Sequence, residues 1–135
     1  MGKSIKEVDR EEAVQLLKTL MPLSEQVAPI VRRITKVDAN DMLVADLEDF
    51  LEAVKELPPI LESMKRVPKP KDKELRKYKK EIEDSLDACI KACKWYLKFA
   101  ESPSRVRLAS IVFQMSVATS LMESATQRLT LLTNK

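Results

Sequence analysis

The stretch that decides the fold is "LRKYKKEIEDSLDACIKACKWYLKFA", which runs from Leu75 to Ala100. Its apolar residues recur every three or four positions, the spacing that places side chains on one face of an α-helix. Charged residues fill most of the other positions, so the pattern predicts an amphipathic helix with one face in a protein core. The expected core residues are Leu75, Tyr78, Ile82, Leu86, Cys89, Ile90, Cys93, Leu97 and Ala100.

The same spacing predicts three more helices, at about residues 9–37, 43–64 and 105–133. The helix that contains Leu75–Ala100 is expected to start near residue 71. The chain of 135 residues contains a single glycine, which disfavours the tight hairpin turns of β-rich folds. We therefore expect an all-α protein. Short connections favour antiparallel neighbours, so the predicted fold is an up-down-up-down four-helix bundle made of one domain, 1–135, with a flexible segment at 1–8.

Prolines occur inside two of the expected helices, Pro22 and Pro29 in the first and Pro58 and Pro59 in the second. Because an interior proline removes a backbone hydrogen bond and clashes with the preceding turn, both helices are expected to be kinked. Either the bundle simply bends there, or a local gap admits a ligand or a partner side chain. For the helix starts, Asp38 or Asn40 is the expected cap of the second helix and Ser102 that of the fourth.

A second stretch, "LASIVFQMSVATSLM" (Leu108–Met122), contains no charged residue, although a third of the chain is Asp, Glu, Lys or Arg. Fifteen helical residues span about 22 Å, less than the roughly 30 Å hydrocarbon core of a bilayer. We therefore expect protein, and no membrane, to cover this stretch. Its core face is expected to contain Leu108, Ile111, Met115, Met122 and Leu129, flanked by Val112, Ala118 and Ala125.

The opposite face of this fourth helix lacks the Lys and Glu residues of an ordinary solvent face. Three serines recur there at every fourth position, and small residues at this spacing let another helix approach closely. Two explanations stay open: the first helical region covers this face, or a second chain does. An aromatic pair on the third helix also lies off the core face and has the composition of a binding hot spot. The predicted homodimer or partner interface contains Phe113, Val117, Ser116, Ser120, Ser124, Trp95 and Phe99.

Charge is unevenly distributed along the chain. Residues 38–62 contain eight acids and one lysine, for a net charge of −7, and residues 65–80 contain nine basic and two acidic residues, for +7. Basic side chains crowd the start of the third helix, where the helix dipole disfavours cations, so this terminus is a candidate anion-binding site. The candidate residues are Lys69, Lys71, Lys73, Arg76, Lys77 and Lys80. Nucleic acid is a weakly supported partner because the segment 65–80 contains one aromatic residue for base stacking.

The chain contains no histidine, which excludes the usual catalytic triads, histidine zinc sites and the Glu-x-x-His di-iron sites of helical bundles. Cys89 and Cys93 are expected to be small core residues. The acidic pairs "EE" (Glu11 and Glu12), "DLED" (46–49) and "EIED" (81–84) resemble those of the all-α nucleotide pyrophosphohydrolases, with Gln15 where a further acid is expected. The resemblance implies a Mg²⁺-dependent nucleotide hydrolase whose ligands are Asp46, Asp49, Glu81 and Asp84.

These observations favour a cytoplasmic, non-enzymatic protein-interaction or scaffold module that self-associates and needs no cofactor. Two alternatives remain: a bundle that binds anionic ligands or nucleic acid through residues 65–80, and the Mg²⁺-dependent hydrolase.

Overall fold

The structure is a computed structural model that describes residues 10–36, 38–40, 42 and 44–133. The expected flexible segment 1–8 lies outside these residues. Across the described part of the chain the regular structure is entirely helical: α1 (Arg10–Ile34), α2 (Leu47–Arg66), α3 (Lys73–Glu101) and α4 (Arg105–Thr133). The prediction of an all-α fold with four helices is confirmed.

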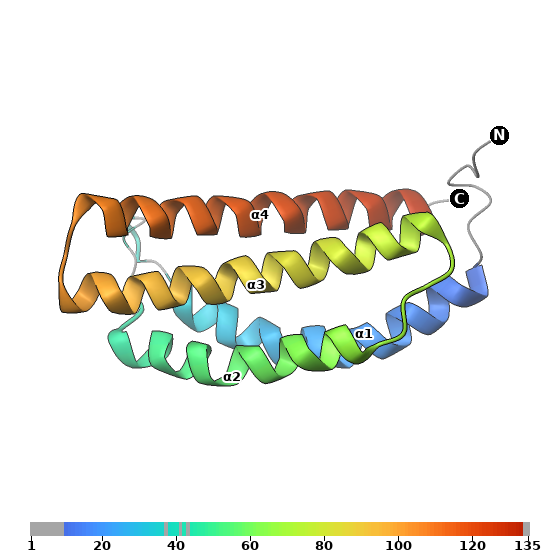
Figure 1. Cartoon of the computed structure of the whole chain (residues 1–135), viewed down its shortest axis with the longest axis horizontal. Helices are drawn as coiled ribbons and strands as arrows, with labels where there is room; N and C mark the ends of the chain where they lie inside the picture. Colours follow the sequence, from blue (N-terminus) through green and yellow to red (C-terminus); the bar gives the residue numbers. More distant parts are fainter. Residues whose placement is uncertain (1–9, 37, 41, 43, 134–135) are drawn as a thin grey trace.

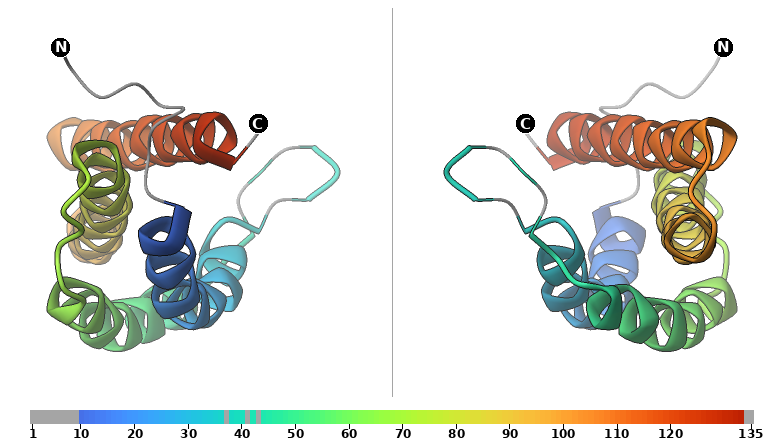
Figure 2. Two further views of the ribbon diagram at one scale, coloured as in Figure 1. Left: turned by 90° about the vertical axis from the view of Figure 1, so that its right-hand side faces the viewer. Right: turned by 90° about the vertical axis from the view of Figure 1, so that its left-hand side faces the viewer.

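Successive helices run in opposite directions, so the up-down-up-down order is also confirmed (Figure 1). Each helix packs mainly on its neighbour in the chain: α1 on α2, α2 on α3 and α3 on α4. Viewed end-on, the four helices form an arc with α1 and α4 at its two ends (Figure 2). The bundle is therefore open between its first and last helices.

The helix starts differ from the predicted caps. Asp46 caps α2, because its carboxylate accepts a hydrogen bond from the Asp49 N–H at 3.1 Å and the Asp49 carboxylate accepts one from the Asp46 N–H at 3.1 Å. Asp38 instead organises the preceding loop by accepting the N–H groups of Asn40 and Met42. Ser104, not Ser102, begins α4: its hydroxyl accepts the Arg107 N–H at 3.1 Å.

Prolines lie within two helices, as expected, and each helix continues through them. Pro22 and Pro29 are inside α1, and Pro58 and Pro59 are inside α2. Whether these positions bend the helices stays a prediction from the sequence.

The core is centred on α3. Every residue of its predicted core face from Leu75 to Cys93 is buried, Leu97 is half-buried and Ala100 is exposed. Near the end of α3, the Tyr96 ring stacks on Phe50 of α2 with centroids 3.8 Å apart. Because α3 lies between α2 and α4, a second strip of its surface is buried as well, which the one-sided pattern did not predict.

That second strip packs on α4 through small residues. Ala88 and Ala92 of α3 and Ala118 and Ala125 of α4 are all buried. The Ser85 hydroxyl donates a hydrogen bond of 2.8 Å to the Ala118 carbonyl, a contact between a short side chain and a neighbouring backbone. Small side chains permit this close approach of the two helices.

We predict that Ser85→Val destabilises the protein by about 1–3 kcal/mol, because two methyl groups would overpack the α3–α4 contact and the hydrogen bond would be lost. Urea unfolding followed by circular dichroism measures this change. Ser63→Val is the matched control, since the Ser63 hydroxyl bonds within its own helix to the Pro59 carbonyl. Equal losses of unfolding free energy in Ser85→Val and Ser63→Val would contradict a close α3–α4 contact.

Candidate binding groove and the predicted site residues

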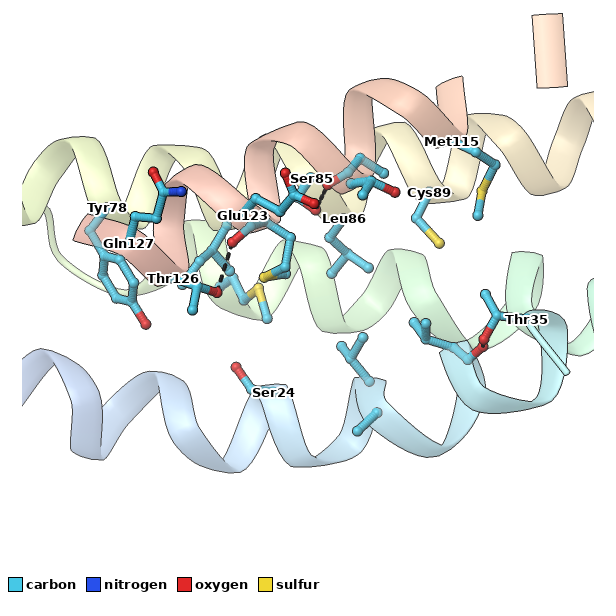
Figure 3. A pocket seen from close by; sticks show the side chains of 18 residues that line it. Ser24, Thr35, Tyr78, Ser85, Leu86, Cys89, Met115, Glu123, Thr126 and Gln127 are labelled. Carbon is cyan, nitrogen blue, oxygen red and sulfur yellow. Dashed lines mark hydrogen bonds between the residues drawn. The ribbon is translucent and has the colours of Figure 1, made fainter. Parts of the chain in front are cut away.

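A groove of about 740 Å³ lies between α1 and α4, at the open side of the bundle. One wall is α1, the other wall is α4, and α3 with Met64 of α2 forms the floor (Figure 3). Its lining includes Ser24, Ala28, Tyr78, Thr119, Glu123 and Gln127.

Most of the groove surface is apolar even where the side chains carry hydroxyls. Three lining hydroxyls donate to backbone carbonyls: Ser85 to Ala118, Thr35 to Val31 at 2.7 Å, and Thr126 to Met122 at 2.8 Å. Their polar atoms are therefore occupied. Among the lining residues in the described part of the chain, Glu123 is the one with a charged side chain.

Tyr78 lies at the floor of the groove and is 7% exposed. Burial raises the pKa of its phenol. Its hydroxyl has no hydrogen-bond partner among the residues that the structure describes. Figure 3 shows the Tyr78 hydroxyl directed into the space between α3 and α1, at the same end of the groove as Ser24, Thr126 and Gln127. The opposite end is formed by Thr35, Cys89 and Met115.

The predicted core face of α4 only partly faces the core. Ala118 and Ala125, two of its flanking residues, are buried, whereas Leu108, Met122 and the third flanking residue, Val112, are about half exposed. α4 packs mainly on α3 and is not covered by α1, so its buried face is centred on the small residues that fit α3. Periodicity found an apolar face, but it could not show that the flanking alanines, and not the larger side chains, would be buried.

The seven predicted interface residues lie in two environments. Val117 packs against the core, the Ser124 hydroxyl donates to the Glu81 carboxylate, and Trp95 and Phe99 are half-buried at the end of α3. Trp95 also has the Lys98 ammonium 4.8 Å from its ring centroid. By contrast Phe113, Ser116 and Ser120 are exposed.

The first half of α4 presents an exposed apolar surface, which we call the α4 patch. It contains Phe113, 60% exposed, together with Val106, Leu108 and Val112. This patch lies before Met115, where the groove begins along α4.

The start of α3 is already occupied by carboxylates. Asp72 accepts the N–H groups of Glu74 and Leu75, and Glu12 of α1 accepts those of Lys71 and Asp72 at 3.0 and 2.8 Å. The backbone donors that a phosphate would use are therefore bonded within the protein. Two of the predicted anion-binding side chains form ion pairs, Lys77 with Glu74 and Lys80 with Asp84. The hydrogen bond and the charge of Asp84 raise the pKa of Lys80. The other four are exposed: Lys69, Lys71, Lys73 and Arg76.

The predicted Mg²⁺ ligands are engaged in separate interactions. Asp46 and Asp49 form the capping box of α2, Glu81 bonds to Ser124 and Arg128, and Asp84 pairs with Lys80. Within the described ranges, no group of three or more Asp, Glu, Cys or His side chains is placed to hold a metal ion.

Cys89 and Cys93 are both buried and free, and Cys89 reaches the groove floor. A hydrogen bond between the two thiols, together with burial, raises the pKa of Cys93, and the same hydrogen bond lowers the pKa of Cys89.

One helix of the described chain is long and apolar enough to cross a membrane by length and composition. It is the 26-residue stretch Arg105–Thr130, with a mean hydropathy of 1.2 and 11% of the apolar window buried. The prediction that this segment does not span a membrane rested on fifteen charge-free residues, and the complete helix is longer. The absence of a membrane partner therefore stays a prediction.

Comparison of the chain with protein-family models, with curated proteins and with solved structures finds no match.

Tyr78, Ala28 and Glu123 were not among the binding residues predicted from the sequence. A gap near the prolines was one of the two expectations, but Pro22 and Pro58 do not line the groove, which lies between α1 and α4. The signal that could have found it is the composition of α4, whose apolar residues surround the helix and exceed what contact with one neighbour can bury.

Two carboxylates of α3 bind Arg128 of α4: the Glu81 Oε1–Arg128 Nε distance is 2.7 Å and the Glu74 Oε2–Arg128 Nη1 distance is 2.5 Å. Burial by itself raises the pKa of Glu81. The hydrogen bonds from Arg128 and Ser124 and the charges of Arg128 and Lys77 outweigh it, so the pKa lies below its ordinary 4.5. Glu81 thus stabilises the folded state above pH 4.5, and this contribution is lost as the pH falls from 4.5 through the lowered pKa.

We predict that Glu81→Gln flattens the acid limb of the stability curve, and that Arg128→Met costs about 1–2 kcal/mol at neutral pH because Glu81 and Glu74 lose their partner. Urea unfolding between neutral and acidic pH measures both. Asp87→Asn is the control, since Asp87 pairs with Lys91 on its own helix. An acid limb in Glu81→Gln as steep as in the parent protein would contradict the assignment.

Proposed function

We propose that this protein is a non-enzymatic helical interaction module that self-associates through the α4 patch. The observation that carries the proposal is that α4 packs mainly on α3 while Val106, Leu108, Val112 and Phe113 of the same helix stay exposed. Several large apolar side chains exposed within one short stretch of a helix favour an interaction surface.

A second copy of the chain is the favoured partner. The segment Leu108–Met122 carries no charge, so two α4 helices in a two-fold contact bring no like charges together there. Ser116 and Ser120 are exposed beside Phe113, and their small side chains allow a close helix pair. Arg107, the nearest cation, already donates to the Lys98 and Ser102 carbonyls at 2.6 and 3.0 Å.

The two other functions predicted from the sequence have weaker support. Anion binding at the start of α3 would compete with Glu12 and Asp72 for the backbone donors, and Mg²⁺-dependent hydrolysis needs acids that are engaged elsewhere. A cytoplasmic location remains part of the proposal, supported by the two free thiols.

We predict that the protein sediments as a dimer and that Phe113→Glu weakens the dimer by at least about thirtyfold, because a carboxylate would be desolvated at the centre of the contact. Analytical ultracentrifugation over a range of concentrations measures the dissociation constant. Met42→Glu, which introduces the same charge at an exposed apolar residue outside α4, should sediment like the parent chain. A monomeric parent, or equal dissociation constants for the parent and Phe113→Glu, would refute self-association through the α4 patch.

A further inference from the structure

We infer that the groove between α1 and α4 is a binding site for a slender single-chain amphiphile whose head group is not anionic and can donate a hydrogen bond. This site is separate from the α4 patch and does not depend on self-association.

The size of the groove favours a chain-like molecule over a docked helix. Along α1 the lined stretch from Ser24 to Thr35 is about 16 Å long. An α-helix of that length and about 10 Å across occupies roughly 1,300 Å³. The groove offers about 740 Å³, within the range of small-molecule sites.

The polarity of the groove is that of an amphiphile. Its surface is largely apolar because the hydroxyls of Ser85, Thr126 and Thr35 are bonded to backbone carbonyls. At one end the Tyr78 hydroxyl is directed into the space without a hydrogen-bond partner among the described residues, although the side chain is 93% buried (Figure 3). The hydroxyl oxygen itself reaches the groove, so a ligand atom at this end could accept its hydrogen bond.

The sign of the head group follows from Glu123. It is the charged side chain of the lining and comes from the same end of α4 as Thr126 and Gln127. A carboxylate or phosphate head would be repelled there, whereas a hydroxyl or an ammonium could donate to Glu123. A hydroxyl could also accept from Tyr78, and an ammonium would be favoured by the Tyr78 ring. The alkyl chain would extend toward Met115 and Cys89 at the other end.

The test is displacement of the neutral fluorophore N-phenyl-1-naphthylamine by twelve-carbon compounds below their micelle concentrations. Dodecylamine and dodecanol should displace the fluorophore, and dodecanoate should bind at least about tenfold more weakly than either. Octylamine should bind about 250-fold more weakly than dodecylamine, because it lacks four methylenes and each buried methylene contributes about a fourfold factor. Failure of the fluorophore to bind saturably, or dodecanoate binding as well as dodecanol, would overturn the proposal.

Variants locate the site. Ala28→Trp and Thr119→Trp fill the groove from opposite walls and should each abolish fluorophore binding, while Ala100→Trp, at an exposed position outside the groove, should leave it unchanged. Tyr78→Phe preserves the shape of the groove and should weaken the binding of dodecanol by about twofold to tenfold. Glu123→Gln should reduce the difference in affinity between dodecylamine and dodecanoate.

Circular dichroism confirms that each variant is folded before it is scored. If both filled variants bind like the parent chain, the ligand lies elsewhere and the assignment is wrong. Because Phe113→Glu alters the α4 patch and not the groove, it should dissociate the dimer without changing fluorophore binding, so the two proposals can fail separately.

Discussion

The close contact between α3 and α4 is the constraint on which the rest of the structure depends. It is made by alanines on both helices and by the Ser85 hydroxyl on the Ala118 carbonyl, and Arg128 fixes its far end between Glu74 and Glu81. Once α4 lies against α3 in this way, it cannot also cover α1. The open groove and the exposed α4 patch both follow from this single choice of neighbour.

The fold was predictable because helical spacing and the near absence of glycine leave few alternatives. The buried face of α3 was read correctly from Leu75 to Cys93, since a regular pattern of large apolar residues determines which side of a helix faces the core. The helix starts were less predictable: Asp38 and Ser102 have the right residue type, but Asp46 and Ser104 have the backbone donors within reach.

The candidate sites could be predicted only in part. The absence of charges predicted that the first helix or a second chain covers the face of α4 around Phe113, but Phe113 and two of its serine neighbours are exposed in the chain. Ser124 instead bonds to Glu81 of α3, and Val117 packs against the core. Their direction depends on which alanines pack, a difference of side-chain volume that periodicity does not register. Tyr78 was recognised as a core residue, yet the free position of its hydroxyl depends on α1 lying away from α4, and no local pattern encodes that separation.

Glu12 joins two segments that are distant in sequence, since its carboxylate accepts the backbone N–H groups of Lys71 and Asp72. At the opposite end, Arg33 of α1 pairs with Glu52 of α2 at 2.8 Å. α1 is therefore held near both of its ends by contacts with other segments. The spacing between α1 and α4 is therefore set by the contacts of each helix with α2 and α3, so the width of the groove does not depend on a direct contact between its two walls.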